Sequence, residues 1–195
     1  MLVQLIGFAA GILLVRRLDQ HEYALFTIAN TMQGTINVLA DIGISIGLVS
    51  IGGRVWQDRN RFGELVSTGL KLRRKLGATA VLTVTPLLYL MLVKNGASVF
   101  YAAILITAIL GGLCVQLSLG VLDVVPRLRS DIRQIQRIDL TGSAVRLAIL
   151  VGLAFIFLNA GVAAVIGSGT LLLQYLMLRR YARGVIDLRA EENAG

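Results

Sequence analysis

The sequence predicts an all-α, polytopic membrane protein: one bundle of six transmembrane helices with both termini in the cytoplasm. Three observations lead to this fold class. Charged residues make up only 15% of the chain, whereas soluble domains contain about 25%. Apolar runs long enough to cross a bilayer recur along the whole length, without the alternation of a transmembrane β-barrel. Lys and Arg are concentrated in every second connection, as the positive-inside rule requires.

The apolar runs define the expected spans. The first is short for a bilayer, because 15 helical residues extend only about 22 Å. The last is too long for one crossing and contains the turn-forming sequence Asn159-Ala160-Gly161 near its middle, so a tight helical hairpin is expected. The six spans therefore come from residues 1–15, 23–53, 76–93, 95–122 and the two halves of 140–178.

The distribution of the 19 Lys and Arg residues sets the predicted orientation. Only Arg16, Arg17 and Lys94 fall in the connections that follow the odd-numbered spans, and Arg146 lies inside a span. All the others lie in the long second and fourth connections or after residue 178. Positive residues stay on the cytoplasmic side. Residues 1–178 are thus expected to form a bundle with its termini inside, and 179–195 a cytoplasmic tail that is first basic and then acidic.

No motif indicates an enzyme, a metal site or a cofactor. His21 is the only histidine and Cys114 the only cysteine, so neither a metal-ligand cluster nor an intrachain disulfide is expected. No Walker sequence is present, and Gly167-Ser168-Gly169 lies within an apolar run instead of following a strand. The net charge of +8 is explained by membrane topology, and no nucleic-acid partner is predicted.

Polar side chains within the apolar runs are the candidates for function. Asn30, Gln33, Asn37 and Asp41 follow one another at spacings of 3, 4 and 4 residues, which places them on one face of the second span. Such a stripe faces a partner helix or a water-filled cavity. Asp41 has two interpretations: a cavity-lining carboxylate that titrates or pairs with a cation, or a structural group that caps or hydrogen-bonds a neighbour.

Arg146 lies inside the fifth span and also has two interpretations. It either snorkels to the cytoplasmic surface or faces inward and attracts an anionic headgroup such as a phosphate. Gln116 and Gln174 either line the same cavity as the amides of the second span or hydrogen-bond between helices. The candidate substrate-path residues are therefore Asn30, Gln33, Asn37, Asp41, Gln116 and Arg146.

The basic second connection contains a helical pattern of its own. Phe62, Leu65, Val66, Gly69 and Leu70 follow the spacing of an amphipathic helix, and four basic residues come soon after them. We expect either an amphipathic helix at the lipid headgroups that runs into the third span, or a solvated basic linker.

Three short segments resemble elements of a known family. Residues 11–18 read Gly-Ile-Leu-Leu-Val-Arg-Arg-Leu, and Glu22-Tyr23-Ala24-Leu25-Phe26 follows, with Ala24 where the family usually has Gly. Residues 39–44 read Leu-Ala-Asp-Ile-Gly-Ile and contain an Asp-x-Gly element. In this order and spacing they resemble the start of bacterial polysaccharide and oligosaccharide flippases, of the multidrug/oligosaccharidyl-lipid/polysaccharide exporter superfamily.

The resemblance implies a transporter of the bacterial cytoplasmic membrane that moves lipid-linked oligosaccharide by alternating access between two six-helix bundles. Its partners would be the anionic lipid-linked glycan, membrane lipids, and a second six-helix half or a second copy of this chain. The chain corresponds to the N-terminal half, and only Arg146 matches the cavity bases thought to meet the carrier's phosphate. A cation-coupled multidrug exporter that uses Asp41 and a non-transporting scaffold for polysaccharide assembly remain alternatives.

Overall fold

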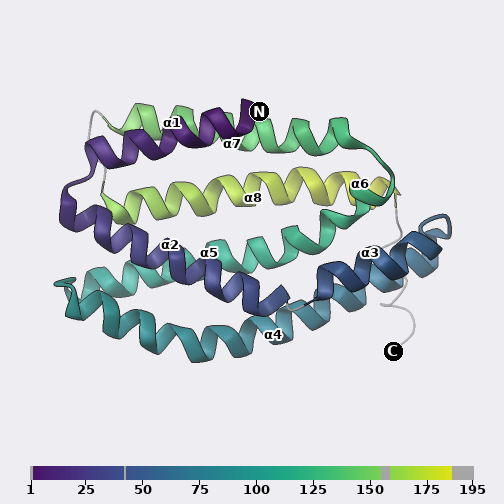
Figure 1. Cartoon of the computed structure of the whole chain (residues 1–195), viewed down its shortest axis with the longest axis horizontal. Coiled ribbons are helices and arrows are strands. Elements are labelled where there is room, and N and C mark those ends of the chain that lie inside the picture. Colours follow the sequence, from purple (N-terminus) through teal and green to yellow (C-terminus); the bar gives the residue numbers. More distant parts are fainter. Residues whose placement is uncertain (1, 42, 155–158, 186–195) are drawn as a thin grey trace.

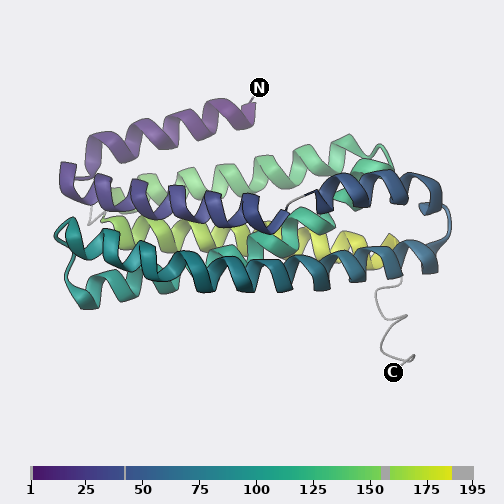
Figure 2. The same cartoon turned by 60° about the horizontal axis from the view of Figure 1, so that its bottom comes forward.

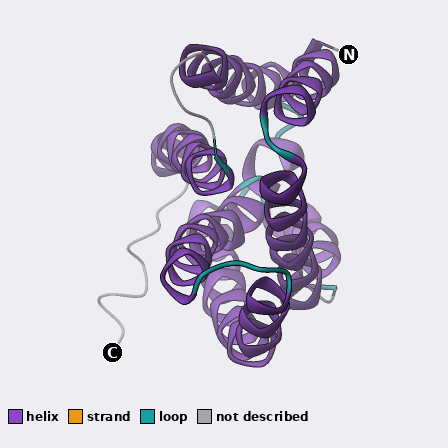
Figure 3. Cartoon of the chain, turned by 90° about the vertical axis from the view of Figure 1, so that its left-hand side faces the viewer, coloured by secondary structure: helices purple, strands orange, loops and turns teal. Residues whose placement is uncertain are grey.

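The computed structural model describes residues 2–41, 43–154 and 159–185, and within these ranges the chain is helical and contains no strand. The view along the long axis shows helices joined by loops, and no strand among the described residues (Figure 3). The prediction of an all-α protein is therefore confirmed. In chain order the helices are α1 (Leu2–Arg17), α2 (Gln20–Asp41), α3 (Ile44–Val55), α4 (Arg59–Lys94), α5 (Val99–Leu122), α6 (Val124–Leu128), α7 (Ile132–Ala154) and α8 (Ala160–Val185).

The helices lie side by side along one axis, and the chain reverses direction at each end (Figures 1 and 2). The α1–α2 and α4–α5 connections lie at one end, which we call the Asn95 end, together with the start of α8. The α3–α4 and α6–α7 connections lie at the opposite end, which we call the Asp58 end, together with the last turns of α8. α2 and α3 together extend alongside α4 over most of its length.

The structure supports a membrane-embedded protein. Among the described residues, α4, the α5–α6 segment and α8 are long and apolar enough to cross a membrane, and α2 with α3 adds a fourth if the bent pair is one span. Large apolar side chains such as Leu82, Phe100 and Ile46 are 76–79% exposed, as expected of helix faces that contact lipid. α1 and α7 are not among the helices that are long and apolar enough to cross a membrane. The six-span bundle and its cytoplasmic termini therefore stay predictions.

The predicted second span, 23–53, is not one continuous helix. α2 ends at Asp41, α3 begins at Ile44, and the two are bent by 45°. Gly43 has φ 80°, a left-handed conformation that glycine adopts without a Cβ clash. The Asp-x-Gly element noted in the sequence is therefore where the helix breaks. Apolar periodicity did not predict this break, because the residues on both sides of it form helix.

The predicted third span is part of a much longer helix, α4. Asp58 begins it, because Oδ1 of Asp58 accepts the backbone N–H groups of Asn60 at 3.0 Å and Arg61 at 3.2 Å. The amphipathic segment does run into the span, as one of the two interpretations predicted. Its apolar face, however, does not lie on headgroups: Phe62 and Val66 are fully buried inside the protein.

The predicted hairpin in 140–178 is present as two separate helices. α7 ends at Ala154, and α8 begins after Asn159, whose Oδ1 accepts the backbone N–H of Val162 at 2.8 Å. α8 continues to Val185, so the first, basic residues of the predicted tail are helical. The acidic part of that tail, 186–195, lies outside the described residues, as do residue 1, residue 42 and residues 155–158.

Buried apolar side chains form a layered core. One cluster fills the Asp58 end, between α3, the first half of α4, α5–α6, α7 and α8. A second fills the Asn95 end, between α2, α4, α5 and the start of α8. A third attaches α1 to α7 and α8, and a fourth joins the middle of α2, α4 and α5. Deeply buried members of the first and second clusters are Phe62 and Val121, and Leu25 and Leu105. Those of the third and fourth clusters are Leu14 and Leu150, and Ile36 and Leu113.

Candidate functional site

A cavity of about 310 Å³ lies between α2, α5, α7 and α8, at the lower end of the size range of small-molecule sites. It collects polar side chains from all four helices. Four of the six candidate residues named from the sequence line it, and so does Gln174. The polar lining residues are Asn30, Gln33, Gln116, Ser143, Arg146, Ser168, Thr170 and Gln174.

Arg146 supplies the positive charge of this cavity. Because α7 begins at Ile132 and not near Leu140, Arg146 lies about 21 Å along the helix. Its Nε is buried and has no hydrogen-bond partner among the described residues, and no carboxylate is among the described lining residues. The inward-facing interpretation is therefore the one that the structure supports. The guanidinium presents donors that the described part of the chain does not saturate.

Gln33 and Gln116 fulfil both interpretations of the polar residues at once, because they line the cavity and hydrogen-bond between helices. Gln33 Nε2 donates to Gln116 Oε1 at 2.9 Å, which joins α2 to α5 while both side chains line the cavity. Ser168 Oγ donates to the carbonyl oxygen of Ala108 at 2.7 Å and so joins α8 to α5. Gly112 makes this approach possible, because a Cβ there would lie 2.5 Å from Ser168 Oγ. The lining side chains thus hold the cavity wall together by hydrogen bonds between helices.

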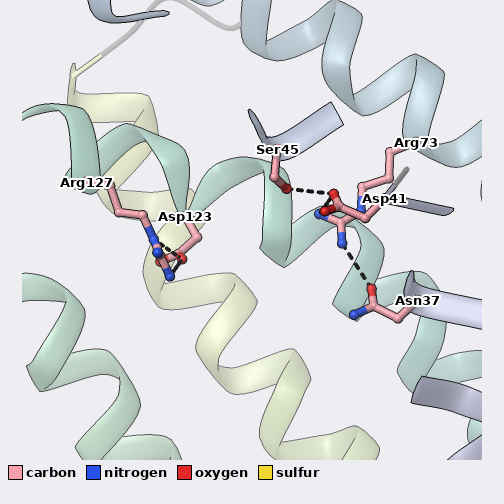
Figure 4. A network of polar contacts seen from close by, with 6 residues as sticks. All are labelled: Asn37, Asp41, Ser45, Arg73, Asp123 and Arg127. Atoms are coloured by element: carbon pink, nitrogen blue, oxygen red, sulfur yellow. Dashed lines mark hydrogen bonds and ion pairs between the residues drawn. The ribbon is translucent and has the colours of Figure 1, made fainter. Parts of the chain in front are cut away.

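Asn37 and Asp41 do not line the cavity but contact Arg73 of α4 (Figure 4). Arg73 Nη2 donates to Asn37 Oδ1 at 3.0 Å, and Nη1 lies 3.6 Å from Asp41 Oδ1. Ser45 Oγ, on the far side of the α2–α3 break, donates to the same carboxylate oxygen at 2.6 Å. We call these four residues the Arg73 cluster. For Asp41, the structure therefore supports the interpretation in which it bonds a neighbour.

Arg73 is the residue that sequence reasoning missed. It was counted with the cytoplasmic basic residues, yet its side chain is only 4% exposed. A signal was present, because Arg73 lies seven residues after Val66 and four after Gly69, which continues the apolar face of the helix. Gly120 of α5 provides the space, since a Cβ at that position would collide with Arg73 Nη1.

A second polar cluster lies at the Asn95 end. Glu22 Oε2, at the start of α2, accepts the Tyr101 hydroxyl of α5 at 2.5 Å and the backbone N–H of Ala160 at 2.8 Å. The Tyr101 oxygen in turn accepts the N–H of Gly161 at 3.1 Å. We call Glu22, Tyr101 and the first turn of α8 the Glu22 cluster. A carboxylate at a helix N-terminus is stabilised by the unpaired N–H groups and by the helix dipole.

The described residues contain no group of three His, Cys, Asp or Glu side chains that could hold a metal ion. No family model, curated protein or solved structure matches the chain. The chemistry of the cavity therefore follows from its own residues.

Proposed function

We propose that this chain is one half of a membrane transporter whose cavity binds the phosphate-bearing end of a lipid-linked oligosaccharide. The observation that carries the proposal is Arg146, a cation with a buried and unpartnered Nε in a cavity whose described lining is otherwise neutral amides, hydroxyls and apolar groups. A phosphate offers several acceptors to one guanidinium, and the bond between them is charge-assisted. Amides and hydroxyls both donate and accept, which suits sugar hydroxyl groups.

The size of the cavity narrows the proposal. A volume of about 310 Å³ accommodates a headgroup and not an extended oligosaccharide. The remaining sugars and the lipid chain would lie outside it, against lipid or against a second half. The resemblance of residues 11–26 and 39–44 to flippases of the polysaccharide exporter superfamily supports the same substrate class and the need for that second half. Alternating access requires two bundles around a shared site.

The alternatives receive less support from the geometry. A cation-coupled multidrug exporter that uses Asp41 requires this carboxylate in the path, whereas Asp41 contacts Arg73 and Ser45 and is absent from the cavity lining. A scaffold that binds assembly enzymes through basic residues at its surface does not require an arginine inside the cavity, and Arg146 lies there.

The test is binding by the full chain, purified in detergent micelles, of a polyprenyl-diphosphate-linked sugar. Arg146→Ala should weaken binding by about 10- to 100-fold, which corresponds to the loss of one charged hydrogen-bond group. Arg133→Ala removes an exposed cation from the same helix and should leave the affinity unchanged.

Export of a surface glycan, measured in cells that express the chain and its second half, should be lost in Arg146→Ala while the variant remains in the membrane. Unchanged affinity and unchanged export in Arg146→Ala would refute the role of the cavity. Lower affinity in Arg133→Ala as well would indicate that net charge alone attracts the lipid.

A further inference from the structure

The Arg73 cluster lies directly beyond the cavity, toward the Asp58 end. On α2, Asn37 follows Gln33 by one helical turn, and on α5, Gly120 follows Gln116 by one turn. The Gln33–Gln116 hydrogen bond, whose two side chains line the cavity, is therefore one helical turn from the layer in which Arg73 contacts Asn37 and covers Gly120.

The cluster connects three helices across a break in the backbone. Arg73 belongs to α4, Asn37 and Asp41 to the last turns of α2, and Ser45 to the first turn of α3. Figure 4 shows the guanidinium between Asn37 and Asp41, with Ser45 reaching the same carboxylate from across the break. One turn further, Leu48 of α3 packs against Gly69 of α4. These contacts hold α3 and the end of α2 against α4.

The junction is not saturated with hydrogen bonds. The Nε and Nη1 atoms of Arg73 are buried without a hydrogen-bond partner among the described residues, and the contact of Nη1 with Asp41, at 3.6 Å, is an ion pair without hydrogen-bond geometry. Buried donors of this kind gain hydrogen bonds when they reach water. Opening the junction therefore returns part of the free energy that separating the helices requires.

We propose that the Arg73 cluster is a latch that closes the Asp58 end of the cavity. When the latch opens, Arg73 leaves Asn37 and Asp41, α3 and the end of α2 move off α4, and the Gln33–Gln116 pair becomes the last barrier to the cavity. The molecule that would pass is the substrate of the proposed function, and only this part of the inference rests on that proposal. The motion itself belongs to the chain and can be measured without substrate.

The test uses two buried reporter cysteines in the full chain with Cys114→Ala, because Cys114 is exposed. Leu48→Cys reports on the α3–α4 contact, where Leu48 is 5% exposed. Leu25→Cys reports on the Asn95 end, where Leu25 is 1% exposed. The measured quantity is the rate at which each reporter thiol reacts with a water-soluble maleimide, in detergent micelles without substrate.

Two substitutions weaken the latch in different ways. Asp41→Asn removes the carboxylate charge, and Gly120→Ala displaces the guanidinium while keeping every charge. Gly111→Ala, also on α5, is the matched control, because a Cβ there meets nothing within 4 Å. Both latch variants should raise the reaction rate of the Leu48→Cys reporter by about tenfold or more. The Leu25→Cys reporter should not change, and the control should change neither.

An unchanged rate of the Leu48→Cys reporter in both latch variants would overturn the latch. An equal increase of the Leu25→Cys reporter would do the same, because it indicates general loosening. Should a latch variant not reach the membrane, spin labels at exposed Ile51 and Leu72 can be used with the natural latch residues in place. Two distance populations are then expected, and a single one refutes the motion. Neither result depends on Arg146, so failure of the latch is distinguishable from failure of the cavity to bind a phosphate.

Discussion

At each end of α2, a cluster around one charged side chain joins three helices. The two clusters differ in how many hydrogen bonds that charged side chain makes. At the Asn95 end, one oxygen of Glu22 accepts two donors, and the Tyr101 hydroxyl both donates and accepts. At the Asp58 end, Arg73 makes one hydrogen bond, to Asn37, while its Nε and Nη1 have no hydrogen-bond partner in the described part of the chain.

How firmly a buried charge holds a junction depends on how many of its hydrogen bonds are formed. A saturated network loses several bonds when it opens, whereas an unsaturated one exchanges poor contacts for water. We therefore expect the Glu22 cluster to act as a fixed anchor for α2, α5 and α8. The Arg73 cluster is the junction that yields.

The largest expected effect is at the anchor. Glu22→Ala should lower the free energy of unfolding by about 3 kcal/mol, because it removes the acceptor of two hydrogen bonds to a carboxylate and leaves the backbone N–H of Ala160 without a partner. The measurement is equilibrium unfolding in mixed micelles. Glu64→Ala, which removes an exposed carboxylate from α4, is the control, and an equal loss in both variants would contradict the anchor.

A smaller loss, about 1.5 kcal/mol, is expected for Asp41→Asn. Deleting one partner of a buried ion pair costs about 3–5 kcal/mol, but the Asp41 side chain is 33% exposed and 3.6 Å from Arg73. The same unfolding measurement applies. Adding Arg73→Met should restore most of the stability, since no charge then remains buried without a partner. A further loss in the double variant would show that Arg73 stabilises the fold through contacts other than this pair.

Tyr101→Phe should cost about 1 kcal/mol, because it removes one hydroxyl from a saturated network and leaves the ring in place. Thermal unfolding in micelles detects a loss of this size. Tyr23→Phe, at an exposed tyrosine on α2, should have no effect. Equal stability of Tyr101→Phe and the wild-type chain would show that the anchor depends on Glu22 alone.

Ser45→Ala should have the smallest effect, less than about 0.5 kcal/mol. The carboxylate of Asp41 loses one donor but becomes free to approach Nη1 of Arg73, which lies 3.6 Å away and has no hydrogen-bond partner among the described residues. Ser50→Ala, at an exposed serine of the same helix, sets the baseline for the unfolding measurement. A loss above about 1 kcal/mol would mean that Ser45, and not Arg73, is what fixes the position of Asp41.

Much of the helical framework was predictable, because long apolar runs and the turn-forming Asn159 mark where helices lie and end. The break at Gly43 was not, since one glycine in an apolar run is equally compatible with a packed helix. The gathering of Asn30, Gln33, Gln116 and Arg146 was anticipated as one of two arrangements. The sequence did not predict that Asn37 and Asp41 would contact Arg73 instead of lining the cavity, because this depends on which helices become neighbours.

The burial of Arg73 was also not predictable from the local sequence. Its helical spacing from Val66 and Gly69 was visible, but the adjacent basic residues gave an equally good reason to place it in solvent. Only Gly120, 47 positions further along the chain, decides the matter, because it provides the space for the guanidinium. Local periodicity alone therefore does not decide whether such a residue contacts a distant helix.

The length of α4 implies that one part of the protein's core lies within the bilayer and another part lies outside it. Its 36 residues extend about 54 Å, well beyond the roughly 30 Å of a hydrocarbon layer. We therefore expect the charged first half to lie outside the bilayer, together with the cluster around Phe62. A layer surrounded by water would be stabilised by the hydrophobic effect, whereas helices within lipid are not. Urea and cold should thus loosen the Asp58 end of the molecule while the span in the membrane stays folded.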